Sequence, residues 1–353
     1  MSLPSTADHE KRDRKAEHID LALEERMQLS AHFFDRYYFD HQALPEIDMA
    51  DVDTTARFLG YRLRSPLLIS CMTGGTGAAT RINRNLAIAA QTAGIAIGVG
   101  SQRKAIEDPS QVESFRIRSL APDVPILANL GAVQLNYGFG LAECRQAVEM
   151  IEADALVLHL NPLQEAIQPE GQCNFAGLVE KMARVAADLE VPVLAKEIGC
   201  GLSFEAGRRL KDAGITILDT AGLGGTSWAR IEASRADDVG LGELFSTWGV
   251  ATPRSIRELR ALGGITIIAS GGLRSGLDVA KAIAMGADLA GMAQRFLEAA
   301  HESPEAAVER AATVRRELRI AMFCAGAGSV TELQSVELRR IEQLAASGAG
   351  ESV

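Results

Sequence analysis

Aromatic residues are scarce in this chain, since phenylalanine, tyrosine and tryptophan together account for only 5% of its 353 residues. Hydrophobic residues reach 47%, so alanine, leucine, isoleucine and valine must form most of the core. Small aliphatic side chains suit the layered interior of an α/β barrel and the contacts between its strands and helices. The length exceeds the roughly 250 residues of one such barrel. We therefore expect one domain with additional N-terminal and inserted segments.

Long apolar runs, paired cysteines and an excess of basic residues are also missing. No run approaches the roughly 20 apolar residues of a membrane span, and the charged N-terminus lacks the apolar core of a signal peptide. The five cysteines are far apart and form no C-x-x-C, which suggests neither a disulfide framework nor a zinc site. A net charge of −10 argues against a nucleic-acid partner. We expect a soluble, cytoplasmic protein without a membrane partner.

Eight short apolar runs recur along the chain, and each ends in a polar or glycine-rich cluster. The runs cover residues 67–70, 95–98, 126–129, 155–159, 193–197, 215–219, 266–270 and 289–291. A strand, a polar tip and a helix, repeated eight times, predict an α/β fold of the (β/α)8 TIM-barrel type. Because the reactive groups of this fold lie where its strands end, we expect the site at the tips of these runs.

Helical periodicity divides the chain around these runs into three parts. It predicts helices at 12–27, 77–90, 141–153, 175–189, 204–213, 255–262, 277–286, 304–323 and 330–345. We expect residues 1–60 to form an N-terminal extension whose helix covers the barrel mouth, residues 61–325 to form the barrel, and residues 326–353 to form a C-terminal helix and tail. The connection from 220 to 265 is longer than a crossover needs, and such loops are usually functional.

The segments GGLRSG at 271–276 and GMAQ at 291–294 follow the last two runs. Glycines let backbone N–H groups approach an anion closely, and a helix N-terminus adds partial positive charge. Barrels of this type commonly bind phosphate after strands seven and eight. The two segments therefore predict a phosphate site, and the alternative is a pair of tight turns.

Polar groups at the other tips suit a planar ligand. Lys196 ends the fifth run, and a lysine in a barrel mouth needs a negative partner. A flavin or a phosphate would supply that partner, and an ion pair with Glu197 or Asp219 is the alternative. The segments 72–75 and 101–103, together with Asn129, end the first three runs and offer hydrogen bonds with little bulk.

The most distinctive stretch, HLNPLQE at 159–165, follows the fourth run. It brings an imidazole, two amides and a carboxylate into one loop. A single carboxylate such as Glu165 can ligate Mg²⁺ when substrate phosphates supply further oxygens. The alternatives are a buried structural role for His159 and a helix-start carboxylate for Glu165. After the sixth run, Trp228 follows a glycine-rich segment and would either wall a pocket or pack in the core.

At these tips the sequence resembles the type 2, FMN-dependent isopentenyl-diphosphate delta-isomerases, from residue 14 to about residue 340. The resemblance rests on RKxxH at 14–18, MTGG at 72–75, GSQR at 100–103, HLNxLQE at 159–165, PEG at 169–171, GGTSW at 224–228, WG at 248–249 and SGGLR at 270–274. The glycine and phosphate motifs are shared with many flavin barrels, whereas RKxxH, HLNxLQE and PEG together are specific. Two positions differ from the family pattern: Cys71 replaces a small polar residue, and Gln172 replaces an acid.

The resemblance implies a role for each of these tips. The expected FMN-binding residues are Ser70, Cys71, Met72, Thr73, Ser101, Asn129, Lys196, Thr226, Gly271, Gly272, Leu273, Ala293 and Gln294. The expected substrate-binding residues are Arg14, Lys15, His18, Ser101, Gln102, Arg103, His159, Asn161 and Gln164. Glu165 is the expected Mg²⁺ ligand, and the expected catalytic residues are Gln164, His159, Lys196 and Trp228.

The reaction that the resemblance implies is the interconversion of isopentenyl and dimethylallyl diphosphate in isoprenoid biosynthesis. It is a 1,3-allylic proton shift in which reduced FMN acts as acid and base, Mg²⁺ binds the diphosphate and NADPH reduces the flavin. The resemblance also implies a homo-tetramer or homo-octamer, in which the N-terminal helix covers its own barrel mouth or that of a neighbouring subunit.

Two other functions stay open. An FMN-dependent oxidoreductase of the hydroxy-acid oxidase or inosinate dehydrogenase type would share the barrel and the phosphate turns. However, the sixth run lacks the histidine and arginine residues that the former needs, and Cys200 is the only candidate for the nucleophile of the latter. A non-catalytic flavin- or phosphate-binding barrel would leave the charged tips unused, and unpaired buried charge is destabilising.

Overall fold

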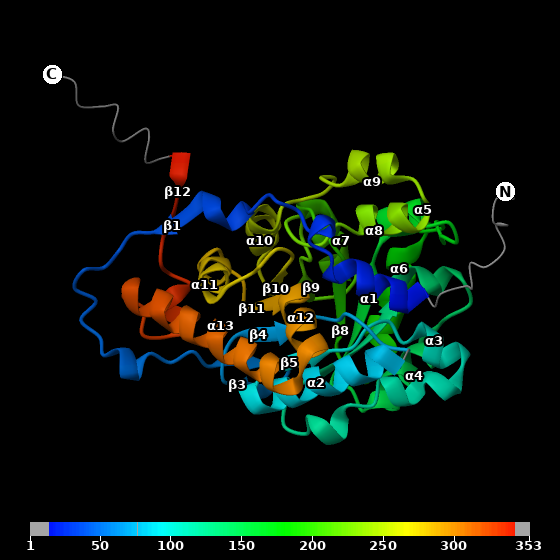
Figure 1. Ribbon diagram of the computed structural model, residues 1–353, viewed down its shortest axis with the longest axis horizontal. Helices are drawn as coiled ribbons and strands as arrows, with labels where there is room; N and C mark the ends of the chain where they lie inside the picture. Colours follow the sequence, from blue (N-terminus) through cyan, green and yellow to red (C-terminus); the bar gives the residue numbers. More distant parts are fainter. Residues whose placement is uncertain (1–13, 76, 343–353) are drawn as a thin grey trace, which may run out of the picture.

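The computed structural model describes residues 14–75 and 77–342, and its centre is a closed barrel of eight parallel strands (Figure 1). The strands follow one another around the barrel in chain order, as β4 (Leu67–Ile69), β5 (Ala96–Gly98), β6 (Ile126–Gly131), β7 (Ala155–Leu160), β8 (Val193–Glu197), β9 (Ile217–Asp219), β10 (Thr266–Ser270) and β11 (Leu289–Met292). Each strand overlaps one of the eight apolar runs, so the predicted (β/α)8 barrel is confirmed. Parallel strands that are covered on both faces are expected to be apolar throughout.

Helices surround the barrel and connect its strands. They are α2 (Gly77–Ala93), α3 (Arg103–Glu107), α4 (Leu141–Ile151), α5 (Pro162–Ile167), α6 (Leu178–Asp188), α7 (Phe204–Asp212), α8 (Trp228–Arg235), α9 (Val239–Phe245), α10 (Thr252–Arg260), α11 (Gly276–Ala284), α12 (Gln294–Glu302) and α13 (Pro304–Cys324). The long connection after β9 is therefore mostly helical. None of the helices in residues 14–75 and 77–342 combines the length and the apolar character needed to cross a membrane.

The last barrel strand, β11, is followed by α12 and then α13, whereas the periodicity predicted one helix, at 304–323, before the C-terminal one at 330–345. The break lies at Ser303, whose side chain accepts a hydrogen bond from the N–H of Ala306 and so caps α13. Pro304 is the first residue of α13, a position where a proline needs no N–H partner and fits the helical φ angle. A serine cap followed by proline thus ends α12 and starts α13.

The end of the barrel where the strands begin is closed by a hairpin of β2 (Ala56–Phe58) and β3 (Tyr61–Leu63). Phe58 and Leu63 pack against the inward-facing residues of the barrel strands, and both are buried. The expected boundary between residues 60 and 61 lies inside this hairpin. The N-terminal segment is therefore part of the barrel core.

The opposite end of the barrel is covered by α1 (Arg14–Leu23) and a 3-10 turn at Glu25–Met27. The backbone after this turn pairs with the connection between β9 and α8, since the N–H of Leu29 donates to Gly225 O and the N–H of Ser227 donates to Met27 O. The N-terminal helix thus lies over the mouth of its own barrel, as one of the two expected arrangements requires.

The predicted helix at 330–345 is wrong. The structure has one helical turn, α14 (Val330–Leu333), and then strand β12 (Leu338–Arg340), which pairs antiparallel with β1 (Tyr37–Phe39). The partner strand comes from the N-terminal segment, about 300 residues away in sequence, so local periodicity did not reveal it. Residues 343–353 of the expected tail lie outside the described residues.

Candidate active site

One large cavity opens where the barrel strands end, beneath α1. It encloses about 1790 Å³ when its open mouth is included. Residues at the ends of the barrel strands and residues of α1 line this space.

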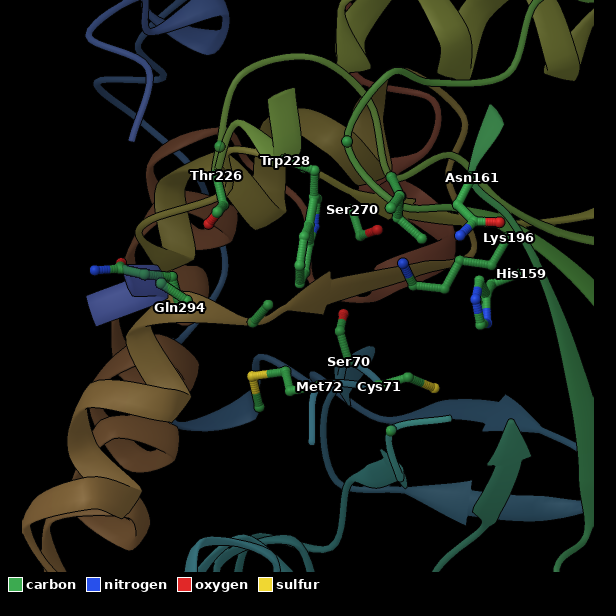
Figure 2. A pocket seen from close by; sticks show the side chains of 18 of the residues that line it. Ser70, Cys71, Met72, His159, Asn161, Lys196, Thr226, Trp228, Ser270 and Gln294 are labelled. Carbon is green, nitrogen blue, oxygen red and sulfur yellow. The ribbon is translucent and has the colours of Figure 1, made fainter. Parts of the chain in front are cut away.

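Nearly all of the predicted site residues that the structure describes line this cavity. These are His18, Ser70, Cys71, Met72, Thr73, Ser101, Arg103, Asn129, His159, Asn161, Gln164, Glu165, Lys196, Thr226, Trp228, Gly271, Gly272, Leu273, Ala293 and Gln294. Arg14 and Lys15 begin α1, but their side chains lie outside the described part of the chain. Figure 2 shows Trp228 and Ser70 entering the cavity from opposite sides, with Gln294 at one end and His159 and Asn161 at the other.

Gln102, a predicted substrate-binding residue, is the exception, because it does not line the cavity. Its side chain is fully buried and lies behind the cavity wall. Its Nε2 donates to Ala147 O at 2.8 Å, and its Oε1 accepts from the N–H of Asn129 at 2.9 Å. Both ends of the amide are thus used to join the tip of β6 to α4. Gln102 thus fixes the position of the cavity wall.

A glycine-lined cradle forms one end of the cavity. Gly271 and Gly272 have φ angles of +100° and +80°. An added Cβ at Gly271 would lie 2.1 Å from Gly222 O, and one at Gly272 would lie 2.4 Å from Gly224 O. Only glycine lets these two loops approach so closely, which leaves backbone groups facing the cavity.

Arg274 extends this cradle and was not among the predicted binding residues. Its Nη2 donates to Leu29 O at 2.9 Å, whereas its Nη1 is buried with no hydrogen-bond partner in the described part of the chain. A buried donor without a protein partner is satisfied by water, an ion or a ligand, and this one lies on the cavity wall. The beginning of α12 at Gln294, next to Ala293, adds partial positive charge at the same end. The arginine of GGLR was the signal in the sequence.

Lys196 lies on the floor of the cavity. Its Nζ donates to Glu197 O at 2.7 Å, and it forms no ion pair with any described residue. The Glu197 carboxylate instead accepts the N–H groups of residues 198 and 199, at 2.6 and 2.7 Å, and those of 200 and 201. The structure therefore disfavours the Lys196–Glu197 ion pair and leaves the ammonium available to a ligand.

The second alternative partner of Lys196, Asp219, is paired with a hydroxyl. Its carboxylate accepts from Ser270 Oγ and from the N–H of Ala221. Burial raises the pKa of Asp219, and the nearby Lys196 charge opposes that rise. Ser70 Oγ is buried beside this group without a hydrogen-bond partner among the described residues.

His159 is a neutral imidazole in this environment. Burial, and then the Lys196 charge, lower the pKa of His159 to about 3. Its Nδ1 lies 2.7 Å from Asn129 Oδ1. Because that oxygen can only accept, Nδ1 carries the proton and Nε2 presents a lone pair.

Glu165 is a buried carboxylate held by nitrogen donors. Its Oε1 accepts from Asn161 Nδ2 at 2.8 Å, and its Oε2 accepts from Gln168 Nε2 and from the N–H of Gln172. Oε1 therefore keeps a lone pair for a cation. No group of three or more His, Cys, Asp or Glu side chains among the described residues could hold a metal by itself. A cation at Glu165 would need oxygens from a ligand.

A network around Glu232 connects α1 to the end of the cavity where Gln164 lies. Glu232 Oε1 lies 3.0 Å from His18 Nε2 and accepts from Gln164 Nε2 at 2.6 Å, and its Oε2 accepts from Arg235 at 2.6 Å. Burial by itself raises the pKa of Glu232, but these hydrogen bonds outweigh burial and lower it. The ring of Trp228 meets His18 edge-on at 5.2 Å. Glu232 was not predicted as a site residue, because one acid on a helix gives no local signal.

The thiol that an inosinate dehydrogenase would need is not activated here. Burial, and then the Glu197 charge, raise the pKa of Cys200 to about 12. Burial also raises the pKa of Cys71 to about 11. Both side chains are therefore thiols at neutral pH, and a thiol is a weaker nucleophile than a thiolate.

Comparison with known proteins completes the description. Residues 247–340 match the model of the FMN-dependent dehydrogenase family. An isopentenyl-diphosphate delta-isomerase of a Nostoc species is 48% identical over 350 residues, which covers 97% of this chain and 100% of the relative. That of Paracoccus zeaxanthinifaciens is 49% identical over 346 residues, covering 94% and 98%. A mandelate oxidase with an FMN adduct aligns over 92% of both chains with a TM-score of 0.62 and 20% identity, which is a likeness of fold alone.

Proposed function

The chain belongs to the family of isopentenyl-diphosphate delta-isomerases, and on that premise we propose how its cavity performs their reaction. Its activity is the interconversion of isopentenyl and dimethylallyl diphosphate, since relatives with this name share 48% and 49% identity over nearly the whole chain. The observation that carries the proposed site is one cavity with Gln294 at one end and Asn161 at the other, where Asn161 bonds the Gln164 amide and the Glu165 carboxylate.

The cofactor that the family match supports is FMN, and the cavity fits it. Its phosphate would bind the backbone at Gly271–Leu273 and 293–294, together with the unpartnered Arg274 Nη1. The tips at 70–73, with Ser101, Asn129 and Thr226, would hold the ring. Lys196 would lie against the negative charge of the reduced ring, because it has no ion-pair partner among the described residues. When bound, reduced FMN supplies the acid–base group for the allylic proton shift without net oxidation.

The substrate would occupy the other end of the cavity. Arg14, Lys15, Ser101 and Arg103 would bind its diphosphate, with His18, His159 and Asn161 beside them. Arginine forks match phosphate oxygens well, and charge-assisted hydrogen bonds are about twice as strong as neutral ones. Glu165 Oε1 would ligate Mg²⁺, and the diphosphate would complete the coordination of the cation.

The reaction adds a proton to the terminal CH₂ carbon of the alkene and removes one from the allylic CH₂ group bonded to the tertiary carbon. The positive charge that develops at the tertiary carbon needs a negative or electron-rich environment. Trp228 would wall the hydrocarbon and exclude water. Gln164, held by Glu232 and Asn161, would orient its amide toward the reacting carbons. The residues of the chain thus position the substrate, stabilise the developing charge and exclude water.

Three further features of the proposal rest on the resemblance. NADPH would reduce the flavin, the protein would act in the cytoplasm, and it would assemble as a homo-tetramer or homo-octamer. The free cysteines are consistent with a reducing compartment.

The decisive experiment is an anaerobic incubation of the purified protein with FMN, NADPH, Mg²⁺ and isopentenyl diphosphate. We expect dimethylallyl diphosphate to form only when reduced flavin is present. A parallel reaction with a 2-hydroxy acid and an electron acceptor tests the oxidoreductase alternative. Conversion of the olefin without any flavin, or oxidation of the hydroxy acid without conversion of the olefin, would refute the proposal.

A further inference from the structure

Gln172 joins two parts of the proposed substrate site without lining the cavity. It follows the loop that leaves α5 and is half-buried. Its side-chain Oε1 accepts from Arg103 Nη1 at 3.2 Å and from Gln134 Nε2 at 2.9 Å. Its backbone N–H donates to Glu165 Oε2 at 2.6 Å. One residue therefore touches both the arginine proposed for the diphosphate and the carboxylate proposed for the cation.

The close approach of this loop to α5 is built into the backbone. Gly171 precedes Gln172, and a Cβ at this position would lie 1.7 Å from Glu165 O. Only glycine lets the chain pass there, and the next N–H is then directed at the Glu165 carboxylate. The position of Gln172 is thus tied to that of the metal-ligand candidate.

The Arg103 guanidinium needs an orienting partner of this kind. Its other polar contact among the described residues is with Glu107, through Nε at 2.7 Å, and both side chains are partly exposed, 34% for Arg103 and 50% for Glu107. An exposed ion pair contributes little orientation by itself. Gln172 adds a second fixed direction to the planar fork and leaves the remaining N–H groups of Arg103 for a ligand.

The acceptor at position 172 is an amide in this chain, whereas the family pattern usually has an acid there. Either side chain can accept the hydrogen bond from Arg103, so the inference rests on the position of the acceptor. The amide accepts this bond without adding a negative charge beside Arg103 and Glu165.

From these contacts we infer that Gln172 is a positioning residue for the diphosphate, acting through Arg103 as a neutral acceptor. The inference rests on the proposed function, in which Arg103 binds the diphosphate. The Gln172 side chain orients the Arg103 guanidinium toward the substrate. The Gln172 backbone N–H, bonded to Glu165, fixes the position of the guanidinium relative to that carboxylate. Its effect should therefore lie in substrate binding and should vanish when Arg103 is absent.

A double-mutant cycle tests this, with Gln172→Leu, Arg103→Ala and the double variant, all assayed anaerobically with FMN, NADPH and saturating Mg²⁺. We expect Gln172→Leu to raise the KM for isopentenyl diphosphate about tenfold, with kcat within about twofold and FMN affinity unchanged. In the Arg103→Ala background, the same substitution should leave the KM as it is. Gln91→Leu is the matched control, because Gln91 bonds Asp123 outside the residues that line the cavity.

The outcomes separate the inference from the proposed function. If Arg103→Ala raises the KM but Gln172→Leu does not, or if the two effects simply add, the positioning role is refuted and the function stands. If Arg103→Ala leaves the KM unchanged, the diphosphate assignment itself fails. Gln172→Met serves as a second variant without the acceptor if Gln172→Leu loses flavin or melts early.

Discussion

At the scale of single residues, the cavity is defined by polar atoms that lack a partner or keep a free lone pair. Arg274 Nη1 and Ser70 Oγ are buried without hydrogen-bond partners among the described residues. Glu165 has one oxygen fully used and one with capacity to spare. Burying such groups is unfavourable unless a ligand completes them. Each therefore leads to a test on one side chain.

Glu165→Gln removes the charge of the proposed cation ligand and keeps its shape. We expect the Mg²⁺ concentration for half-maximal activity to rise about tenfold or more, since a neutral amide binds Mg²⁺ far more weakly than a carboxylate does. FMN binding should not change. Glu149→Gln, on the exposed side of α4, is the control. Wild-type dependence on Mg²⁺ in the Glu165 variant would rule out the metal assignment.

Arg274→Ala removes the unpartnered donor of the glycine cradle. We expect the Kd for FMN, measured by flavin fluorescence, to rise about tenfold or more because a charge-assisted bond to phosphate is lost. The affinity for riboflavin, which has no phosphate, should stay the same. Arg208→Ala, a surface arginine of α7, is the control. Equal weakening of FMN and riboflavin would show that Arg274 only supports the N-terminal segment through Leu29 O.

At the scale of elements, α1 is the part of the site that lies outside the barrel repeat. Its docking depends on the carboxylate of Glu232 on α8, which meets His18 and also holds Gln164 on α5. Glu17 adds a contact with Arg235 at 3.2 Å. Three elements that are distant in sequence are thus joined by one buried acid. Its ionisation should decide how firmly the cavity is covered.

The pH dependence of this network has a definite sign. The pKa of Glu232 is lower in the folded protein than in the unfolded chain, where the pKa of a glutamate is about 4.3. Its stabilising effect is therefore present above that pH and is lost as the pH falls through the folded-state value. We expect Glu232→Gln to melt below the wild type at pH 7 and the gap to narrow below about pH 4. A gap that stays constant with pH would contradict this reading.

At the scale of the whole molecule, the eight barrel strands lie between residues 67 and 292, and the barrel brings their carboxyl ends together on one side. The hairpin β2–β3 closes the other end, and Phe58 and Leu63 pack into the barrel interior. The cavity is therefore the open end of a single core. A ligand that bridges several tips should stabilise the whole fold rather than one loop.

Removal of FMN should accordingly lower the melting temperature of the entire protein. A ligand that binds only the folded state at about one hundred times its Kd stabilises that state by about 2.7 kcal/mol. We expect one cooperative transition that shifts upward with FMN concentration, and a smaller shift with the same concentration of riboflavin. A melting temperature that does not respond to FMN would argue against a flavin site.

The local sequence determined the barrel fold and the residues that line its open end. The eight apolar runs with polar ends were sufficient to predict the barrel, because a parallel strand that is covered on both faces must be apolar along its length. The residues at the tips could be predicted as cavity residues, because the fold places the ends of all its strands on one side of the barrel. Motifs such as HLNxLQE then indicated which family of flavin barrels the chain resembles.

The tertiary structure decided what depends on contacts between distant segments. Gln102 faces Ala147 instead of the cavity, Leu338–Arg340 forms a strand because Tyr37–Phe39 lies beside it, and Glu232 meets both His18 and Gln164. Periodicity predicts which residues of one segment face the core and which face solvent. It does not predict which distant residue a buried polar group bonds, or which strand an edge strand pairs with. Those pairings form when the chain packs, because burying a donor or acceptor without a hydrogen-bond partner costs free energy.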